Sequence, residues 1–174
     1  MGYDDGKAYI PNYEVLVAYN LALQESGWSE VAKSIELCDE LLDETIEGNG
    51  ERVAEIIDLA LEAYTSVLKY NDENSLSCVI TMAYFTAPAY YNIYRELPAG
   101  KGFADVVMLP RADTKNKPPL LIELKYDKDA DSALKQIKEK RYAGALADYM
   151  DEALLVGVNY DKDTKKHECV IERA

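Results

Sequence analysis

The stretch GFADVVMLPRADTKNKPPLLIELKY, residues 102–126, contains two short apolar segments joined by a polar loop that includes proline. The segments 103–109 and 120–125 are rich in branched residues and bounded by glycine or proline, a pattern typical of β-strands. Because both are apolar at successive positions, we expect central strands in a sheet that is covered on both faces. The stretch therefore predicts a β-hairpin in the middle of the fold.

Three charged residues interrupt this apolar hairpin. If the two strands pair symmetrically about residue 114, Asp105 lies opposite Glu123 at about 5 Å. Strand alternation then places Lys125 on the same face as Glu123. Charges in such surroundings are costly to bury unless they pair with one another or bind a metal ion.

Two interpretations of this cluster remain open. The first is a salt bridge from Lys125 to either acid on a solvent-facing strand. The second is a site for a hard divalent cation such as Mg²⁺, held by the carboxylates of Asp105 and Glu123 with the Leu124 carbonyl and waters. In that site Lys125 would orient or deprotonate the water that attacks a phosphodiester.

The rest of the chain predicts how this hairpin is covered. Further strands are expected at residues 90–94, 153–158 and 169–171, and a helix is expected over residues 129–149. The inner stripe of that helix would contain Ala133, Leu134, Ile137, Tyr142, Leu146 and Tyr149. Residues 13–86 show helical spacing, with breaks at Gly27 and at Gly48–Gly50 and a last helix starting near residues 71–73.

The predicted fold is therefore α/β (α+β), with a mixed central sheet of about five strands flanked by helices. The expected organisation is an N-terminal helical region over residues 1–70, packed on a core over residues 71–174.

Composition limits the function classes. The chain has 174 residues and a formal net charge of −13, which disfavours a protein that coats nucleic acid through bulk electrostatics. The charge is uneven, because residues 99–142 contain 10 basic and 7 acidic side chains and leave a local phosphate-binding face open. The three cysteines are far apart and no long apolar run is present, so we expect reduced thiols, a cytoplasmic location and no membrane partner. The single histidine, His167, is expected to be solvated in the polar turn after residue 160.

Asp105, followed after a hairpin by Glu123-Leu124-Lys125, resembles the D…(D/E)xK signature of the PD-(D/E)XK nuclease superfamily. More narrowly, the chain resembles the nuclease-like domain found C-terminal to predicted AAA-ATPase domains in bacterial proteins. The similar segments are residues 10–15, which match the junction after the ATPase part, residues 72–74 and residues 95–102. The resemblance implies a restriction-endonuclease-like core and a Mg²⁺- or Mn²⁺-dependent nuclease acting on DNA in preference to RNA.

The resemblance also implies roles for individual residues. Asp105 and Glu123 would be metal ligands and Lys125 the catalytic lysine, while Glu73 would complete the metal shell from the first core helix. Glu96 is a possible additional carboxylate, and Gln136 corresponds to a glutamine on the following helix that contacts the site. For Glu73, Glu96 and Gln136, a surface or helix-dipole role remains the alternative.

The chain departs from the narrower group at two places. Leu76-Ser77 stands where relatives often have an aromatic-histidine pair, and Phe103-Ala104 precedes the motif aspartate where they often have arginine. A non-catalytic binding or regulatory module, working with an AAA-ATPase partner in cis or in trans, is therefore kept as the second hypothesis.

Overall fold

The computed structural model describes residues 2–4, 7–9, 29–64, 73–99, 102–114, 116–140 and 147–174. The chain divides into two compact units, Met1–Glu36 and Leu37–Ala174. In the first unit, β1 (Gly2–Asp4) and β2 (Lys7–Tyr9) form an antiparallel pair. The helix expected from residue 13 to residue 27 and the junction-like segment 10–15 lie outside the described residues.

The second unit contains a mixed sheet of five strands in the order β3-β4-β5-β6-β7. The strands are β3 (Tyr91–Ala99), β4 (Gly102–Pro110), β5 (Leu120–Tyr126), β6 (Leu154–Asp161) and β7 (Lys166–Arg173). β5 and β6 are parallel, whereas the other neighbouring pairs are antiparallel. All five predicted strands are therefore confirmed, and β4 and β5 are interior strands as expected.

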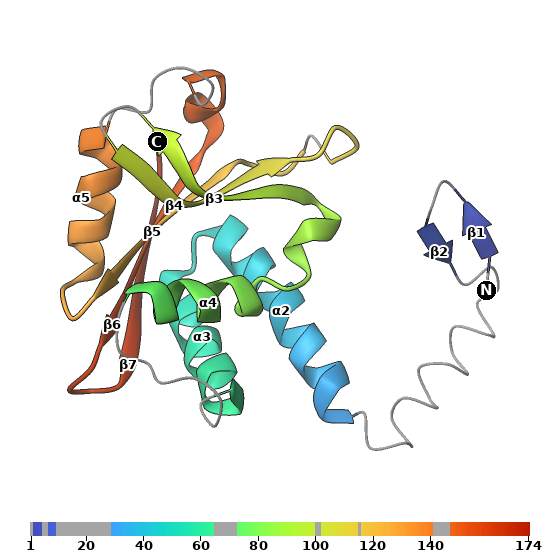
Figure 1. The fold of residues 1–174 in the computed structure, drawn as a ribbon, viewed down its shortest axis with the longest axis horizontal. Helices are drawn as coiled ribbons and strands as arrows, with labels where there is room; N and C mark the ends of the chain where they lie inside the picture. Colours follow the sequence, from blue (N-terminus) through green and yellow to red (C-terminus); the bar gives the residue numbers. More distant parts are fainter. Residues whose placement is uncertain are drawn as a thin grey trace. The chain divides into compact units, whose positions relative to one another are not determined.

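Helices cover both faces of this sheet (Figure 1). On one face, α3 (Gly50–Tyr64), α4 (Glu73–Ala83) and the part of α2 (Ser29–Glu47) after residue 36 pack against alternate strand residues such as Ile122 and Val156. On the other face, α5 (Ala130–Lys140) packs against Val107 and Leu121. α5 connects β5 to β6, which is the crossover that two parallel strands need. The result is the α/β restriction-endonuclease-like core that was predicted.

Local hydrogen bonds fix where the helices begin and end. The Asn49 side chain accepts a hydrogen bond from the backbone N–H of Arg52 at 3.3 Å and caps α3. Gly48, with a φ of 84°, supplies the left-handed turn that ends α2. Asp129 caps α5 by accepting from the backbone N–H and the hydroxyl of Ser132, and these bonds lower the pKa of Asp129.

The helix predicted over residues 129–149 is shorter in the structure. α5 ends at Lys140, residues 141–146 lie outside the described part, and Ala147–Glu152 form a 3-10 helix. Ala133, Leu134 and Ile137 are buried as predicted, but Tyr149 is 40% exposed, so its place in the inner stripe was wrong. Tyr142 and Leu146 fall among the residues that are not described. Over the described ranges, no helix combines the length and apolar character needed to cross a membrane.

The prediction for His167 was also wrong. His167 lies in β7, not in a solvated turn, and it is 6% exposed. Its Nδ1 is 2.8 Å from Oδ1 of Asp58 on α3, and its ring lies 5.0 Å from that of Tyr160. The charged residues around His167 suggested a solvated turn. On a strand, however, side chains alternate between the two faces, so a residue with charged neighbours can still point into the core.

Candidate active site

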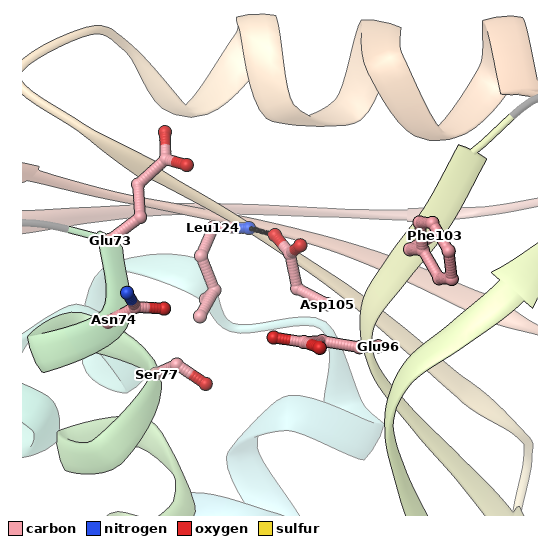
Figure 2. A pocket seen from close by; sticks show the side chains of 7 residues that line it. All are labelled: Glu73, Asn74, Ser77, Glu96, Phe103, Asp105 and Leu124. Atoms are coloured by element: carbon pink, nitrogen blue, oxygen red, sulfur yellow. Dashed lines mark hydrogen bonds between the residues drawn. The ribbon is translucent and has the colours of Figure 1, made fainter.

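A pocket of about 310 Å³ lies between the start of α4 and strands β3, β4 and β5 (Figure 2). Its lining residues are Glu73, Asn74, Ser77, Glu96, Phe103, Asp105 and Leu124. Glu96 and Asp105 extend from neighbouring strands, and the Ser77 hydroxyl on α4 points back toward them. Three of the carboxylates singled out in the sequence, from Glu73, Glu96 and Asp105, thus border one pocket.

The pocket lies where the β3–β4 ladder is interrupted. The ladder pairs Arg95 with Val106 and Leu97 with Ala104, while Glu96 and Asp105, between those pairs, are not paired with each other. Glu96 has a φ of 50°, which is uncommon for a residue other than glycine. In a regular strand Ala104 and Val106 would lie on the same face of the sheet. Here Val106 packs toward α4 and Ala104 packs toward α5. Strict alternation is therefore lost at the two acidic positions.

Asp105 is held by a main-chain hydrogen bond. The backbone N–H of Leu124 donates to Oδ2 of Asp105 at 2.8 Å. The β4–β5 pairs run from Met108↔Leu120 to Val106↔Ile122, so Asp105 and Glu123 come next in the register but are not paired with each other. This register is the one predicted for a hairpin symmetric about residue 114.

Glu123 and Lys125 face the α5 side of the sheet and are buried, at 1% and 7% exposure. Lys125 Nζ is 3.5 Å from Oε1 of Glu123 and donates to the Leu124 carbonyl at 3.0 Å. The ion pair of the first interpretation is thus present, but the solvent-facing strand that it assumed is not. Removing two charges from water is costly, and the cost is offset only when both charges keep well-placed polar contacts. The contacts of Glu123 and Lys125 therefore restrict the positions of both side chains.

Gln136, a partly exposed residue of α5, also contacts this buried pair. Its Nε2 donates a hydrogen bond to Oε1 of Glu123. The close approach of α5 depends on Gly157, which pairs with Glu123 on the neighbouring strand β6. A Cβ at position 157 would lie 2.5 Å from the carbonyl oxygen of Ala130, at the start of α5.

A second contact crosses from the end of β5 to α4. Lys128 Nζ lies 3.8 Å from Oε1 of Glu73. The fully buried Asn159 side chain holds the Lys128 backbone, because it accepts from its N–H and donates to its carbonyl, both at 3.0 Å. The first residue of α4 is thereby linked to the loop that follows Lys125.

Sequence reasoning missed Gly157, Asn159 and Ser77. A signal for the first two was available, because a glycine and an asparagine interrupt the apolar run at residues 154–160. For Ser77 the signal was its position, because Leu76-Ser77 stands where relatives often have an aromatic-histidine pair, but the sequence assigned no role at the pocket to this serine.

The candidate carboxylates divide into two neighbouring groups. Glu73, Glu96 and Asp105 border the pocket, whereas Glu123 contacts Lys125 and Gln136 behind Leu124. In the described part of the chain, three acidic oxygens lie within 4.8 Å of one another only at Asp127, Asp161 and Asp163. That cluster is mainly exposed, and Lys162 pairs with Asp127 within it. Backbone N–H groups of Thr164 and Asp163 lower the pKa of Asp161.

The family comparison matches the part of the chain that contains both groups. Residues 71–169 match the model of the PD-(D/E)XK nuclease superfamily, and this span covers more than half of the chain. No curated protein matches the chain. The match includes α4, the five-stranded sheet as far as residue 169 and α5, and with them every candidate residue named above. The chain belongs to the PD-(D/E)XK nuclease superfamily.

Proposed function

We propose that the protein is a cytoplasmic nuclease that hydrolyses phosphodiester bonds with Mg²⁺ or Mn²⁺, with DNA favoured over RNA. The observation that carries the proposal is the position of Asp105. Its carboxylate borders the acidic pocket and accepts the Leu124 N–H, which ties it to the strand that bears Glu123 and Lys125. This link between Asp105 and β5 supports a joint role for Asp105, Glu123 and Lys125.

The donor set suits a hard divalent cation. The carboxylates of Glu73, Glu96 and Asp105 line the same pocket, and carboxylate oxygens are the ligands that Mg²⁺ prefers. We assign Asp105, Glu123 and Glu73 as the residues that would hold the ion, with Glu96 as a possible addition. A divalent cation bound there would neutralise charge on the phosphoryl oxygens and favour ionisation of a water.

The remaining residues would position and activate the attacking water. Lys125 would orient that water or accept its proton, and its Nζ is held between Glu123 and the Leu124 carbonyl. Gln136 would hold the Glu123 carboxylate from α5 through the hydrogen bond described above. Its role is therefore to fix the orientation of Glu123 beside the catalytic lysine.

Cleavage of plasmid, linear DNA and RNA in Mg²⁺ or Mn²⁺ tests the proposal. Asp105→Asn removes the charge but keeps an oxygen that can accept the Leu124 N–H, so it separates chemistry from folding. Asp105→Asn and Lys125→Ala should each abolish metal-dependent cleavage. Asp113→Ala, at an exposed carboxylate in the β4–β5 loop, should cleave like the wild type. Equal rates in the wild type, Asp105→Asn and Lys125→Ala would contradict the assignment.

The burial of Glu123 favours one alternative, a non-catalytic nuclease-fold module that works with an AAA-ATPase domain. A carboxylate that is 1% exposed and already contacts Lys125 and Gln136 is partly neutralised without a metal ion. Calorimetry with Mn²⁺ distinguishes the two functions. Binding that is lost in Glu123→Ala supports the nuclease, and no binding at millimolar Mn²⁺ supports the module.

A further inference from the structure

Arg95 reaches the wall of the pocket without pairing with its acids. Arg95 is an exposed residue of β3, and its Nη2 donates to the Ser77 hydroxyl at 2.8 Å. Ser77 is 9% exposed and lines the pocket together with the carboxylates. A neutral hydroxyl on α4 therefore holds the guanidinium at the edge of the candidate active site.

The backbone of β3 brings Arg95 and Glu96 to the same side. In a regular strand neighbouring side chains point to opposite faces. Here Arg95 contacts Ser77 on α4, Glu96 lines the same pocket, and the next residue, Leu97, packs on the α5 side. The left-handed φ of 50° at Glu96 is where the alternation breaks. Such backbone conformations are unfavourable for residues other than glycine and concentrate at functional sites.

The other described cations near the pocket already have acidic partners. Lys125 lies beside Glu123, and Lys128 lies beside Glu73. Among the residues that the structure describes, Arg95 has no carboxylate within ion-pair distance. A guanidinium has five N–H donors, and the bond to Ser77 uses one of them. The remaining donors keep the fork geometry that matches a phosphate.

We propose that Arg95, held by Ser77, forms a binding subsite for a backbone phosphate of the nucleic-acid substrate. The inference rests on the proposed function, because it assumes that a phosphodiester enters the acidic pocket. A phosphate placed beside Glu73, Glu96 and Asp105 needs a positively charged group that is not already ion-paired with those acids. Arg95 is a substrate-binding residue in this scheme, and Ser77 is a positioning residue.

Binding measured without cleavage tests the subsite. The probe is a short fluorescein-labelled DNA, single-stranded or duplex, and its anisotropy is followed in Ca²⁺ over a range of salt concentrations. Arg95→Gln should weaken binding by roughly 10- to 100-fold, as expected for loss of charge-assisted hydrogen bonds. It should also reduce the slope of log K against log[salt] by about 0.7–0.9, the contribution of one phosphate contact.

Two further variants separate charge from geometry. Arg95→Lys keeps the charge but loses the fork, so its affinity should lie between the wild type and Arg95→Gln, with the wild-type salt slope. Ser77→Ala keeps the charge and loses the hydroxyl, so binding should weaken by about 2- to 10-fold without a change in slope. A melting temperature for each variant identifies any loss of folded protein.

Arg111→Gln is the matched control. The Arg111 guanidinium also donates to a neutral oxygen, the Pro88 carbonyl at 3.3 Å, but it lies beyond the other end of β4. Its affinity for the probe should stay within about twofold of the wild type. Equal losses in Arg95→Gln and Arg111→Gln would show a general charge effect and overturn the subsite.

The outcomes also separate this inference from the proposed function. A wild-type protein that cleaves DNA, with an Arg95→Gln variant that binds as tightly, overturns the subsite and leaves the nuclease assignment standing. A wild-type protein that neither binds nor cleaves nucleic acid overturns both.

Discussion

Glu123 on β5 and Gly157 on β6 are paired residues of two parallel strands, and the first turns of α5 pass directly over Gly157. The Cβ of an alanine at position 157 would lie 2.5 Å from the Ala130 carbonyl oxygen and 3.1 Å from the Cβ of Ala133. Backbone atoms cannot move aside as a flexible side chain can. The glycine therefore sets the distance between α5 and the strand that carries Glu123.

Gly157→Ala should displace α5 and weaken the hydrogen bond from Gln136 to Glu123. We expect the free energy of unfolding to fall by about 1–3 kcal/mol, as for other overpacked interiors. Under the proposed function, Mn²⁺ affinity measured by calorimetry should fall as well. Both measurements are made on the same purified protein.

Gly50→Ala provides the matched control for that effect. Its Cβ would lie 2.3 Å from the Cys169 carbonyl oxygen, a similar clash between α3 and β7. It should destabilise the protein comparably and leave Mn²⁺ affinity unchanged, because α3 and β7 do not carry Gln136 or Glu123. If Gly50→Ala lowered Mn²⁺ affinity as much as Gly157→Ala does, the effect of Gly157 would be one of general stability.

The buried pair of Lys125 and Glu123 predicts a distinctive double-mutant result. Lys125→Met removes the cation and leaves a carboxylate that is 1% exposed, which should cost about 3–5 kcal/mol of unfolding free energy. The double variant Lys125→Met/Glu123→Gln removes both charges and should recover most of that loss. Urea denaturation measures both changes. A double variant less stable than Lys125→Met would show that the pair is not coupled in this way.

The sheet and the hairpin register could be predicted because local patterns determine them. The segments at 103–109 and 120–125 carry their strand signals within a few residues, and the loop between them is short enough to fix the pairing about residue 114. Asp105 thereby falls beside the strand of Glu123 without any knowledge of the rest of the fold.

Features that depend on distant parts of the chain could not be predicted. The burial of His167 follows from Asp58, which is 109 residues earlier, and the position of Arg95 follows from Ser77 on another element. Asp105 borders the pocket, whereas Glu123 contacts Gln136 of α5, and this separation also depends on residues far apart in the sequence. Symmetric pairing about residue 114 was extended to Asp105 and Glu123, whereas the β4–β5 pairs end at Val106↔Ile122.

α3 and the part of α2 after residue 36 contribute to the same core as the matched family region, and this predicts a contrast within α3. Ile57 is fully buried in a cluster with Leu76 and Ile80 of α4, whereas Leu59 is 45% exposed. Ile57→Ala should lower the unfolding free energy by about 2–5 kcal/mol. Leu59→Ala should change it by no more than about 0.5 kcal/mol. Equal effects in chemical denaturation would show that α3 does not share a core with residues 71–174.

His167 predicts how stability depends on pH. Burial lowers the pKa of His167, although the hydrogen bond that its ring makes to the Asp58 carboxylate opposes the shift. The unfolded chain takes up the proton near the ordinary histidine pKa of about 6.5, whereas the folded chain resists it until a lower pH. Between those values the unfolded state binds more protons, so stability should fall as the pH falls. Above about pH 7 both states are neutral, and His167 should contribute no pH dependence.

The measurement is the unfolding free energy between about pH 8 and pH 5 for the wild type and His167→Gln. Because the chain has one histidine, the difference between the two curves isolates this residue. The difference should have a slope of at most about 1.4 kcal/mol per pH unit, with the wild type losing stability on acidification. In the described part of the chain, Asp58, Lys166 and Tyr160 are charged or titratable groups close to the ring. A wild type that gains stability on acidification relative to His167→Gln would mean that the pairing with Asp58 outweighs burial.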